Sequence, residues 1–198
     1  AGIYCSIKSI GSSSVNGSLI RYPRLFANVP GIEFNGKVHE QIIDSLNKNK
    51  IPLLNSDIEI IHYGYAIDDD GLKRKKERNL ALLISAESNK TSIYDKLKLI
   101  QTLIALEKYD VAELRLKKLI NNKSLSGEQF GLTFYYMSSI KFEKNDLESA
   151  LHYGLKAIRH LIEKPELNYH MYLIYLRLNK LDEAKKYLLS SIKSNKKV

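Results

Sequence analysis

The hydrophobic and polar positions of this chain follow two different periods, and the change comes near residue 90. Over residues 3–8 apolar and polar side chains alternate, which is typical of a half-buried β-strand. A turn rich in glycine and serine at 11–17, followed by an apolar run at 19–26, predicts a β-hairpin. Pro23 lies inside the second run and predicts an edge strand or a β-bulge there.

Two further short strands are predicted at 34–40 and 58–62, separated by a polar excursion at 41–57. In the later strand Ile60 and His62 share one face. The acidic run Asp68-Asp69-Asp70 then predicts a helix start, because carboxylates stabilise the positive end of a helix. This helix is expected to reach about residue 87 and to pack through Leu80, Leu83 and Ile84.

From residue 91 onward the chain reads as amphipathic helices with short polar breaks, and it contains an internal repeat. Ala112, Ala150 and Ala184 end similar five-residue strings and are 38 and then 34 residues apart. A period of 34 residues with a small residue at a helix contact is typical of the tetratricopeptide repeat. We therefore expect three antiparallel helix pairs, capped by the helix that begins near Asp69.

Charge is uneven along the chain. The net charge is +9, of which residues 1–90 contribute +2 and residues 91–198 contribute +7. The basic half would attract acidic partners, but its lysines do not alternate with aromatics, so nucleic-acid binding is not expected. The sequence has one cysteine, Cys5, and no apolar run of 18 residues. An internal disulfide is therefore impossible, a transmembrane helix is not expected, and a cytoplasmic location is predicted.

Imidazole and carboxylate groups lie near glycines at two places, around His39-Glu40 and around His62. In a strand His39 and Glu40 would point to opposite faces, whereas in a loop both could serve one site. Two histidines and one glutamate could form a facial metal triad, but no His-x-x-x-His or cysteine pair supports a self-contained metal site. The residues alone leave structural and catalytic roles open.

Four short motifs follow one another between residues 21 and 83. They are Arg21-x-x-Arg24-Leu25-Phe26, Ile32-x-Phe34-x-Gly36-x-Val38-His39-Glu40, Ile60-x-His62-x-Gly64-Tyr65, and Lys75-Lys76-x-Arg78-Asn79 followed by Leu82-Leu83. This series resembles the C-terminal part of the catalytic domain of bacterial family-2 glycosyltransferases of the GT-A fold. More narrowly, it is similar to the branch that glycosylates peptides and carries tetratricopeptide helices after that domain.

The resemblance implies an α+β chain in three parts. Residues 1–67 would be a β-rich, acceptor-side remnant of the GT-A domain, and residues 68–90 a connecting or capping helix. Residues 91–198 would be an all-α tetratricopeptide-like solenoid of three helix pairs. The Asp-x-Asp motif that holds Mn²⁺ or Mg²⁺ in such enzymes has no counterpart here, since the acidic run at Asp68 lies at a helix start. We therefore expect an inactive fragment that holds no metal tightly.

Site roles follow from the same resemblance. Glu40 would be the base that takes the acceptor proton, with His39 as its orienter or alternative. His62 would approach the metal and the diphosphate, and Arg24 and Arg78 would add positive charge there. For Arg24 the alternative is a salt bridge that anchors its strand.

Two functions are weighed for the parent protein. The first is an inverting, metal-assisted glycosyltransferase that moves a sugar from a nucleotide-sugar donor to a peptide, protein or glycan acceptor. The alternative is a non-catalytic tetratricopeptide module that binds other proteins. Self-association through exposed strand edges is also expected.

Overall fold

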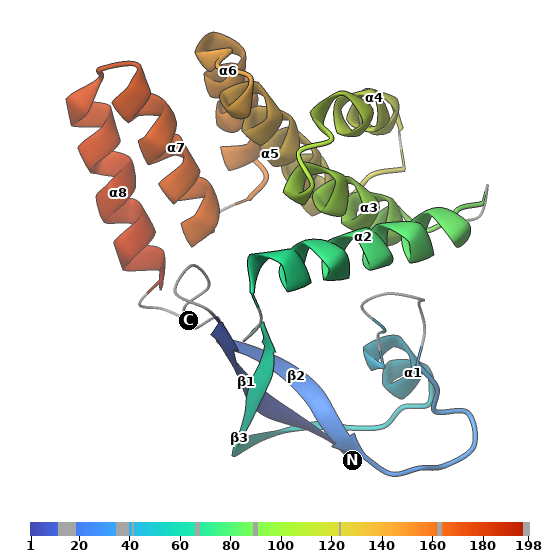
Figure 1. The fold of residues 1–198 in the computed structure, drawn as a ribbon. Helices are drawn as coiled ribbons and strands as arrows, with labels where there is room; N and C mark the ends of the chain where they lie inside the picture. Colours follow the sequence, from blue (N-terminus) through green and yellow to red (C-terminus); the bar gives the residue numbers. More distant parts are fainter. Residues whose placement is uncertain are drawn as a thin grey trace. The chain divides into compact units, whose positions relative to one another are not determined.

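The structure, a computed structural model, describes residues 1–11, 19–34, 40, 42–65, 68–88, 91–122, 124–161 and 164–195. Its internal contacts divide the chain into two compact units, Ala1–Ser88 and Asn89–Val198. Over the described residues the first unit holds a three-stranded sheet and two helices, and the second holds six helices (Figure 1). The expected combination of a small β-rich part and a tetratricopeptide-like helical-repeat part is confirmed at this level.

The sheet of the first unit has the strand order β2-β1-β3. Strand β1 (Gly2–Gly11) pairs antiparallel with β2 (Leu19–Phe26), which confirms the predicted hairpin. The register shifts next to the pair of Tyr4 with Pro23, so the proline lies on an edge strand beside a bulge, as its missing N–H requires. Strand β3 (Leu53–Tyr65) pairs with the other side of β1 in parallel.

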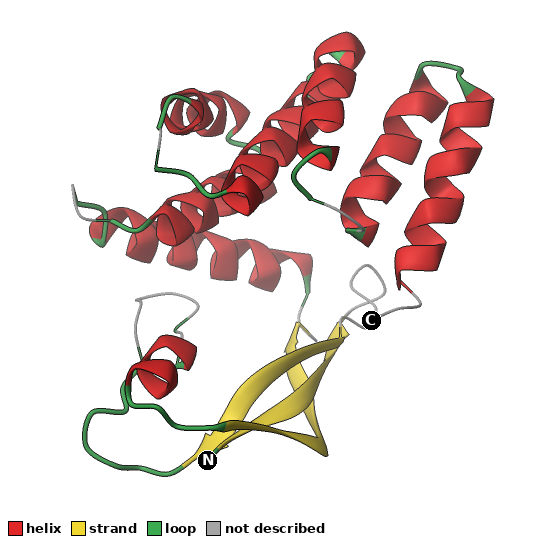
Figure 2. Cartoon of the chain, turned by 180° about the vertical axis from the view of Figure 1, so that it is seen from behind, coloured by secondary structure: helices red, strands yellow, loops and turns green. Residues whose placement is uncertain are grey.

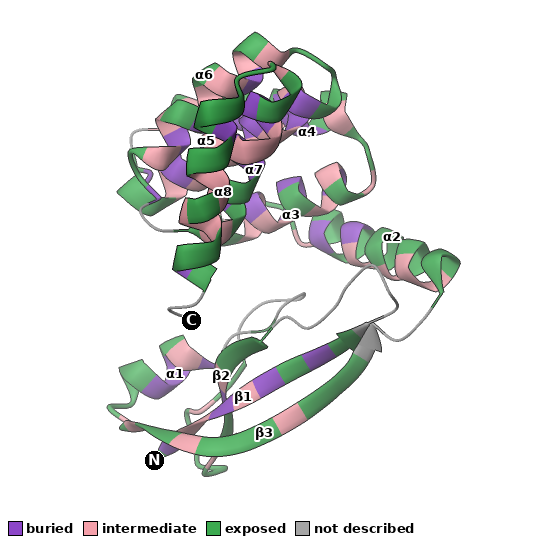
Figure 3. Cartoon of the chain, turned by 90° about the vertical axis from the view of Figure 1, so that its left-hand side faces the viewer, coloured by how far each residue is buried: buried purple, intermediate pink, exposed green. Residues whose placement is uncertain are grey.

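One face of β1 is buried and the other is open. Cys5, Ile7 and Ser9 are buried, and the residues between them are more exposed, so purple alternates with other colours along the strand in Figure 3. Helix α1 (Ile43–Lys48) closes the start of the sheet. A Cβ at Gly2 would lie 2.8 Å from a methyl group of Leu53 and 3.0 Å from one of Leu46 in this helix, so both leucine side chains would have to shift to admit it.

Helix α1 and the first part of β3 occupy the segment 41–57, for which the sequence predicted only a polar excursion. Ile42 and Leu46, one turn apart, are both fully buried and anchor the helix to the sheet. The predicted strand at 34–40 is not formed at Phe34 or Glu40, which lie in irregular chain, and residues 35–39 lie outside the described residues. The predicted strand at 58–62 is the middle of the longer β3.

Helix α2 (Asp69–Ser85) begins where the acidic run predicts. The carboxylate of Asp68 accepts a hydrogen bond from the Gly71 backbone N–H at 2.7 Å and so caps the helix. Leu80 and Leu83 are buried, whereas Ile84 is 50% exposed. Packing of this helix against the first helix pair stays a prediction.

The second unit is built from six consecutive helices that form three pairs (Figures 1 and 2). The helices are α3 (Ile93–Ala105), α4 (Tyr109–Ile120), α5 (Gly127–Glu143), α6 (Leu147–Ile158), α7 (Pro165–Arg177) and α8 (Leu181–Asn195). In the described part of the chain no helix is long and apolar enough to cross a membrane.

The same turn joins the two helices of every pair. Glu107, Asn145 and Asn179 take up the left-handed backbone conformation, with φ of 58°, 61° and 56°. In each turn the next backbone N–H reaches back to a carbonyl five residues earlier, at 2.8 to 2.9 Å, which is the Schellman way of ending a helix. Five residues after each of these positions comes a repeat alanine, and all three alanines are buried. The three predicted repeats are therefore confirmed.

The pairs differ in how closely their helices pack. Helices α7 and α8 lie side by side and antiparallel, as Figures 1 and 2 both show. The first pair is more open: α4 is seen almost end-on in these views, whereas α3 lies across them. The first pair therefore packs less closely than the last.

Candidate interaction surface

Arg24 and His62 lie on the two outer strands of the sheet. Arg24 is next to the pair of Leu25 with Ile3, near the start of β1. His62 pairs with Ser9, near the end of β1. The stretch of β1 between these two pairs is about 20 Å long at 3.3 Å per residue, so the two side chains start far apart. The sheet does not bring them to one diphosphate.

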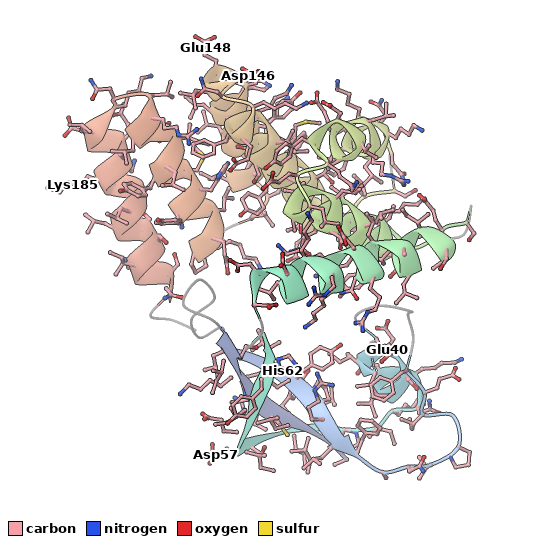
Figure 4. The ribbon with its side chains drawn as sticks, in the orientation of Figure 1. Glu40, Asp57, His62, Asp146, Glu148 and Lys185 are labelled. Atoms are coloured by element: carbon pink, nitrogen blue, oxygen red, sulfur yellow. The ribbon has the colours of Figure 1, made fainter. Side chains whose placement is uncertain are left out.

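The other predicted site residues are also spread over the first unit. Glu40 is exposed and lies beside α1, away from His62 on β3 (Figure 4). His39 lies outside the described residues. Arg78 is exposed on α2 and donates a 3.3 Å hydrogen bond to the side chain of its neighbour Asn79. The guanidinium of Arg24 lies 5.5 Å from the centre of the Tyr22 ring, so stacking holds it along β2.

No metal-binding cluster forms among the described residues: nowhere do three His, Cys, Asp or Glu side chains converge in a way that could hold an ion. His62 is exposed on an edge strand. The triad considered from the sequence includes His39 and therefore stays a prediction. The catalytic and diphosphate-binding roles, which came from the resemblance, have no geometric support in the residues that the structure describes.

A row of tyrosines, which the sequence reasoning missed, follows the first helix of each pair. We call it the tyrosine row, and its members are Tyr94 on α3, Tyr135 and Tyr136 on α5, and Tyr169 and Tyr172 on α7. Tyr94 and Tyr169 are 41% and 49% exposed, and the others are partly exposed. The available signal was spacing, since Tyr135 and Tyr169 are one 34-residue repeat apart.

Ring contacts join the two tyrosines on α5 and the two on α7. The rings of Tyr135 and Tyr136 are 5.7 Å apart, and those of Tyr169 and Tyr172 are 5.5 Å apart. Burial, with smaller contributions from Tyr135 and Tyr94, raises the pKa of Tyr136 to about 12. The hydroxyl therefore stays protonated and can both donate and accept a hydrogen bond. Lys98 lies over the Tyr94 ring at 5.5 Å.

A buried polar network lies beneath the row. The Ser138 hydroxyl on α5 donates a 2.6 Å hydrogen bond to the Ala150 carbonyl of α6, and it lies 2.9 Å from Nε2 of His170 on α7. Because its one proton points to Ala150, the hydroxyl accepts from His170, which fixes a proton on Nε2. Burial lowers the pKa of His170 to about 4, so the imidazole is neutral at pH 7. This network joins three helices, and the Tyr135 ring lies 5.5 Å from the His170 ring.

The contact of α4 with α5 depends on a cluster of charges around Glu113. Its carboxylate accepts from Lys144 at 2.8 Å, Lys117 at 2.9 Å and Lys141 at 3.1 Å, while its side chain is only 10% exposed. Lys144 also reaches Asp110 at 2.7 Å. The hydrogen bond from Lys144 lowers the pKa of Glu113 to about 2, and Lys117 and Lys141 act in the same direction. Burial alone would raise this pKa, but the three lysines outweigh it.

Comparison with known proteins finds a shared fold with solved structures and no family match. No protein-family model matches the chain. No curated protein matches it either. A crystal structure of MamA is similar over 65% of this chain and 75% of that chain, with 19% identity and a TM-score of 0.50. A second crystal structure of MamA gives 21% identity over 64% and 63% of the two chains, with a TM-score of 0.45. MamA from Desulfovibrio magneticus RS-1 covers 67% of this chain and 98% of its own, with 13% identity and a TM-score of 0.35.

At these identities the first MamA structure shows a shared fold and nothing more. The resemblance to a family-2 glycosyltransferase is wrong, because these structural neighbours are MamA proteins and no family or curated match supports a glycosyltransferase. The main functional expectation, a fragment of a sugar-transferring enzyme, is therefore also wrong. The helical-repeat alternative is the better supported of the two.

Proposed function

We propose that this chain is a non-catalytic helical-repeat module that binds other proteins. The tyrosine row is the observation that carries the proposal. Tyrosine offers a large apolar ring with few rotatable bonds and a polar hydroxyl, and it is enriched among the residues that dominate binding energy at protein interfaces. Here five tyrosines on the first helices of three successive repeats are at least partly exposed, and Tyr135 contacts His170 of the buried hydrogen-bonded network.

The binding partner in this proposal is a peptide or a segment of another protein. Repeats that contact only their neighbours form an extended surface, and side chains at equivalent positions of that surface are presented together. Tyr135 and Tyr169 occupy equivalent positions. A partner that spans both would bury two rings at the same spacing as the repeats.

Site-specific photo-crosslinking tests this proposal. A photoreactive phenylalanine derivative is placed at Tyr169 and, as the matched control, at Leu155, which is 39% exposed on α6. The proposal predicts a discrete cross-linked protein from Tyr169 and none from Leu155. With that protein purified, Tyr169→Ser should weaken binding about tenfold, as expected for a hot-spot ring, and Leu155→Ser should not. Equal effects of the two substitutions would contradict the proposal.

Self-association is a second candidate, favoured by the sheet of the first unit. Both outer strands expose apolar side chains: Leu19, Ile20 and Leu25 on β2, and Leu54, Ile58 and Ile61 on β3. Unpaired strand edges with such side chains tend to pair with another chain. Sedimentation analysis should then show a concentration-dependent dimer that Ile61→Lys dissociates, with the exposed α6 change Glu148→Lys as the control. A monomer at all concentrations would rule this candidate out.

A further inference from the structure

The three repeats differ at one equivalent position, the residue that directly follows the buried repeat alanine. This residue is Glu113 in α4, Leu151 in α6 and Lys185 in α8. In the first two repeats the next helix covers it. Glu113 is 8% exposed and pairs with Lys141 and Lys144 of α5. Leu151 packs against the buried cluster that α7 helps to form. Lys185 is exposed.

Other positions on the same side of α8 repeat this contrast. Leu147 and Ile158 of α6 pack against the cluster that includes buried residues of α7. Their equivalents one repeat later, Leu181 and Ile192, are 61% and 47% exposed. We name the surface formed by Leu181, Lys185, Leu188 and Ile192 the α8 face. Figure 4 shows Lys185 projecting from α8 away from α7.

The α8 face is built like α4 and not like α6. In α6 the position of Leu188 is Gly154, and a Cβ there would lie 2.4 Å from the sulfur of Met171, so α7 approaches very closely. Leucine at this position in α8 forbids such an approach. In α4 the same position is Leu116, which is fully buried. In α4 the charge of Glu113 meets helix α5 one turn from this buried leucine, so the contact between α4 and α5 is the template for what α8 can bind.

The charge at the centre of that template is reversed in α8. Glu113 pairs with two lysines that lie one turn apart on α5. A helix packed in the same way against α8 would place its side chains at these two positions next to Lys185. A buried or half-buried lysine needs a carboxylate partner, because an unpaired charge that loses its water is costly. Among the described residues no salt bridge to Lys185 is formed.

We propose that the α8 face binds an amphipathic helix of a partner protein, and that this helix places a carboxylate against Lys185. The leucine and isoleucine side chains of the face receive the apolar side of the helix, and Lys185 selects its charge. This inference rests on the proposed function as a protein-binding module, but it concerns a different surface from the tyrosine row.

The chain supplies its own probe for the test. A synthetic peptide with the α5 sequence, residues 127–144, carries the lysines that meet Glu113, and its K141E/K144E form carries carboxylates at the same places. Both peptides are titrated into the full chain and into its Lys185→Glu variant by calorimetry. Lys185 is exposed, so the variant should keep its melting temperature, and Lys185→Gln serves as the neutral control.

The expected result is a reversal of preference. The full chain should bind the acidic peptide about tenfold more tightly than the basic one, and Lys185→Glu should reverse this order, while Lys185→Gln should abolish the preference. Failure of both peptides to bind, or equal preference in all three chains, overturns the inference. A dimer of the full chain that Lys185→Glu dissociates also overturns it, in favour of a second copy on this face. Tyr169→Ser should leave these titrations unchanged. A negative result in the titrations therefore refutes the proposal for the α8 face without refuting the proposal that the tyrosine row binds a protein.

Discussion

Replacing Glu113 by glutamine tests whether the charge cluster between α4 and α5 stabilises the repeats. The change keeps the size of the side chain and removes the charge that three lysine ammonium groups approach within 2.8 to 3.1 Å. The lysines are not trapped by the loss, because the side chains of Lys117, Lys144 and Lys141 are 63%, 32% and 20% exposed and can turn to water. The cost should therefore be smaller than that of breaking a fully buried ion pair.

The size of the effect follows from the pKa of Glu113. Folding lowers this pKa from 4.5 to about 2, chiefly through the hydrogen bond from Lys144. A difference of this size corresponds to at most about 3 kcal/mol of unfolding free energy. Because solvent screens the exposed lysines, we expect Glu113→Gln to lower the unfolding free energy by about 2 kcal/mol at pH 7.

The sign of the pH dependence is fixed by the direction of the shift. The unfolded chain takes up the proton first as the pH falls, so the stabilisation is complete above pH 4.5 and is lost as the pH falls toward 2. Urea unfolding of the wild type and of Glu113→Gln at pH 7, 4 and 3 measures the difference directly. It should shrink to less than half of its pH 7 value by pH 3.

The control for this series is Glu148→Gln, which changes an exposed glutamate in the first turn of α6 and should cost a few tenths of a kcal/mol at most. A difference between the wild type and Glu113→Gln that stays constant from pH 7 to pH 3 would refute the electrostatic reasoning. So would a Glu113→Gln change no larger than that of the control.

Three further substitutions test the repeat turns, the helix contacts and the buried histidine. Glu107→Gly should raise the free energy of unfolding by about 0.5–1 kcal/mol in urea titrations, because glycine adopts a φ of 58° without strain; a loss of stability would contradict this. Gly154→Ala should lower the free energy of unfolding by about 1–3 kcal/mol, seen as a lower melting temperature, because its Cβ would meet Met171 at 2.4 Å. Gly127→Ala, whose nearest contact is 3.9 Å, should be close to neutral. His170→Gln should flatten the stability profile between pH 6.5 and 4, where the wild type loses stability on acidification because the unfolded imidazole binds a proton first; an unchanged profile would refute the burial argument.

Periodic features of the fold were predictable from the sequence because a repeated physical constraint leaves a repeated residue. The alanines at 112, 150 and 184 are small because two helices meet there, and all are buried. The start of α2 was predictable because Asp68 can cap a helix only at its first turn. Helix α1 was missed because it is six residues long, and its two anchoring apolar residues, Ile42 and Leu46, are too few to show a period.

The predicted site residues have no geometric support among the described residues, and their motifs show why. Its motifs combine residue types that a small sheet also uses for packing: alternation places Ile60 on the face of Ile7, and Arg24 stacks on Tyr22. Short motifs of this kind do not distinguish a site from a strand unless the fold brings them together. The Glu113 cluster was missed because Lys141 and Lys144 are 28 and 31 residues from Glu113 in sequence and reach it only through helix packing.

The equivalent positions 113, 151 and 185 show where this chain can vary without changing its fold. They hold an acid, a leucine and a base, yet the turn before each has a residue in the same left-handed conformation and the same backbone hydrogen bonds. The backbone turn and the buried alanine therefore determine the helix pair, and the residue at the next position determines only which helix can pack beside it. A charge at that position rejects apolar helices and helices of like charge, since either would leave a desolvated ion unpaired. Selectivity in such a module can thus be altered by one residue per repeat while the stability of each pair is left nearly unchanged.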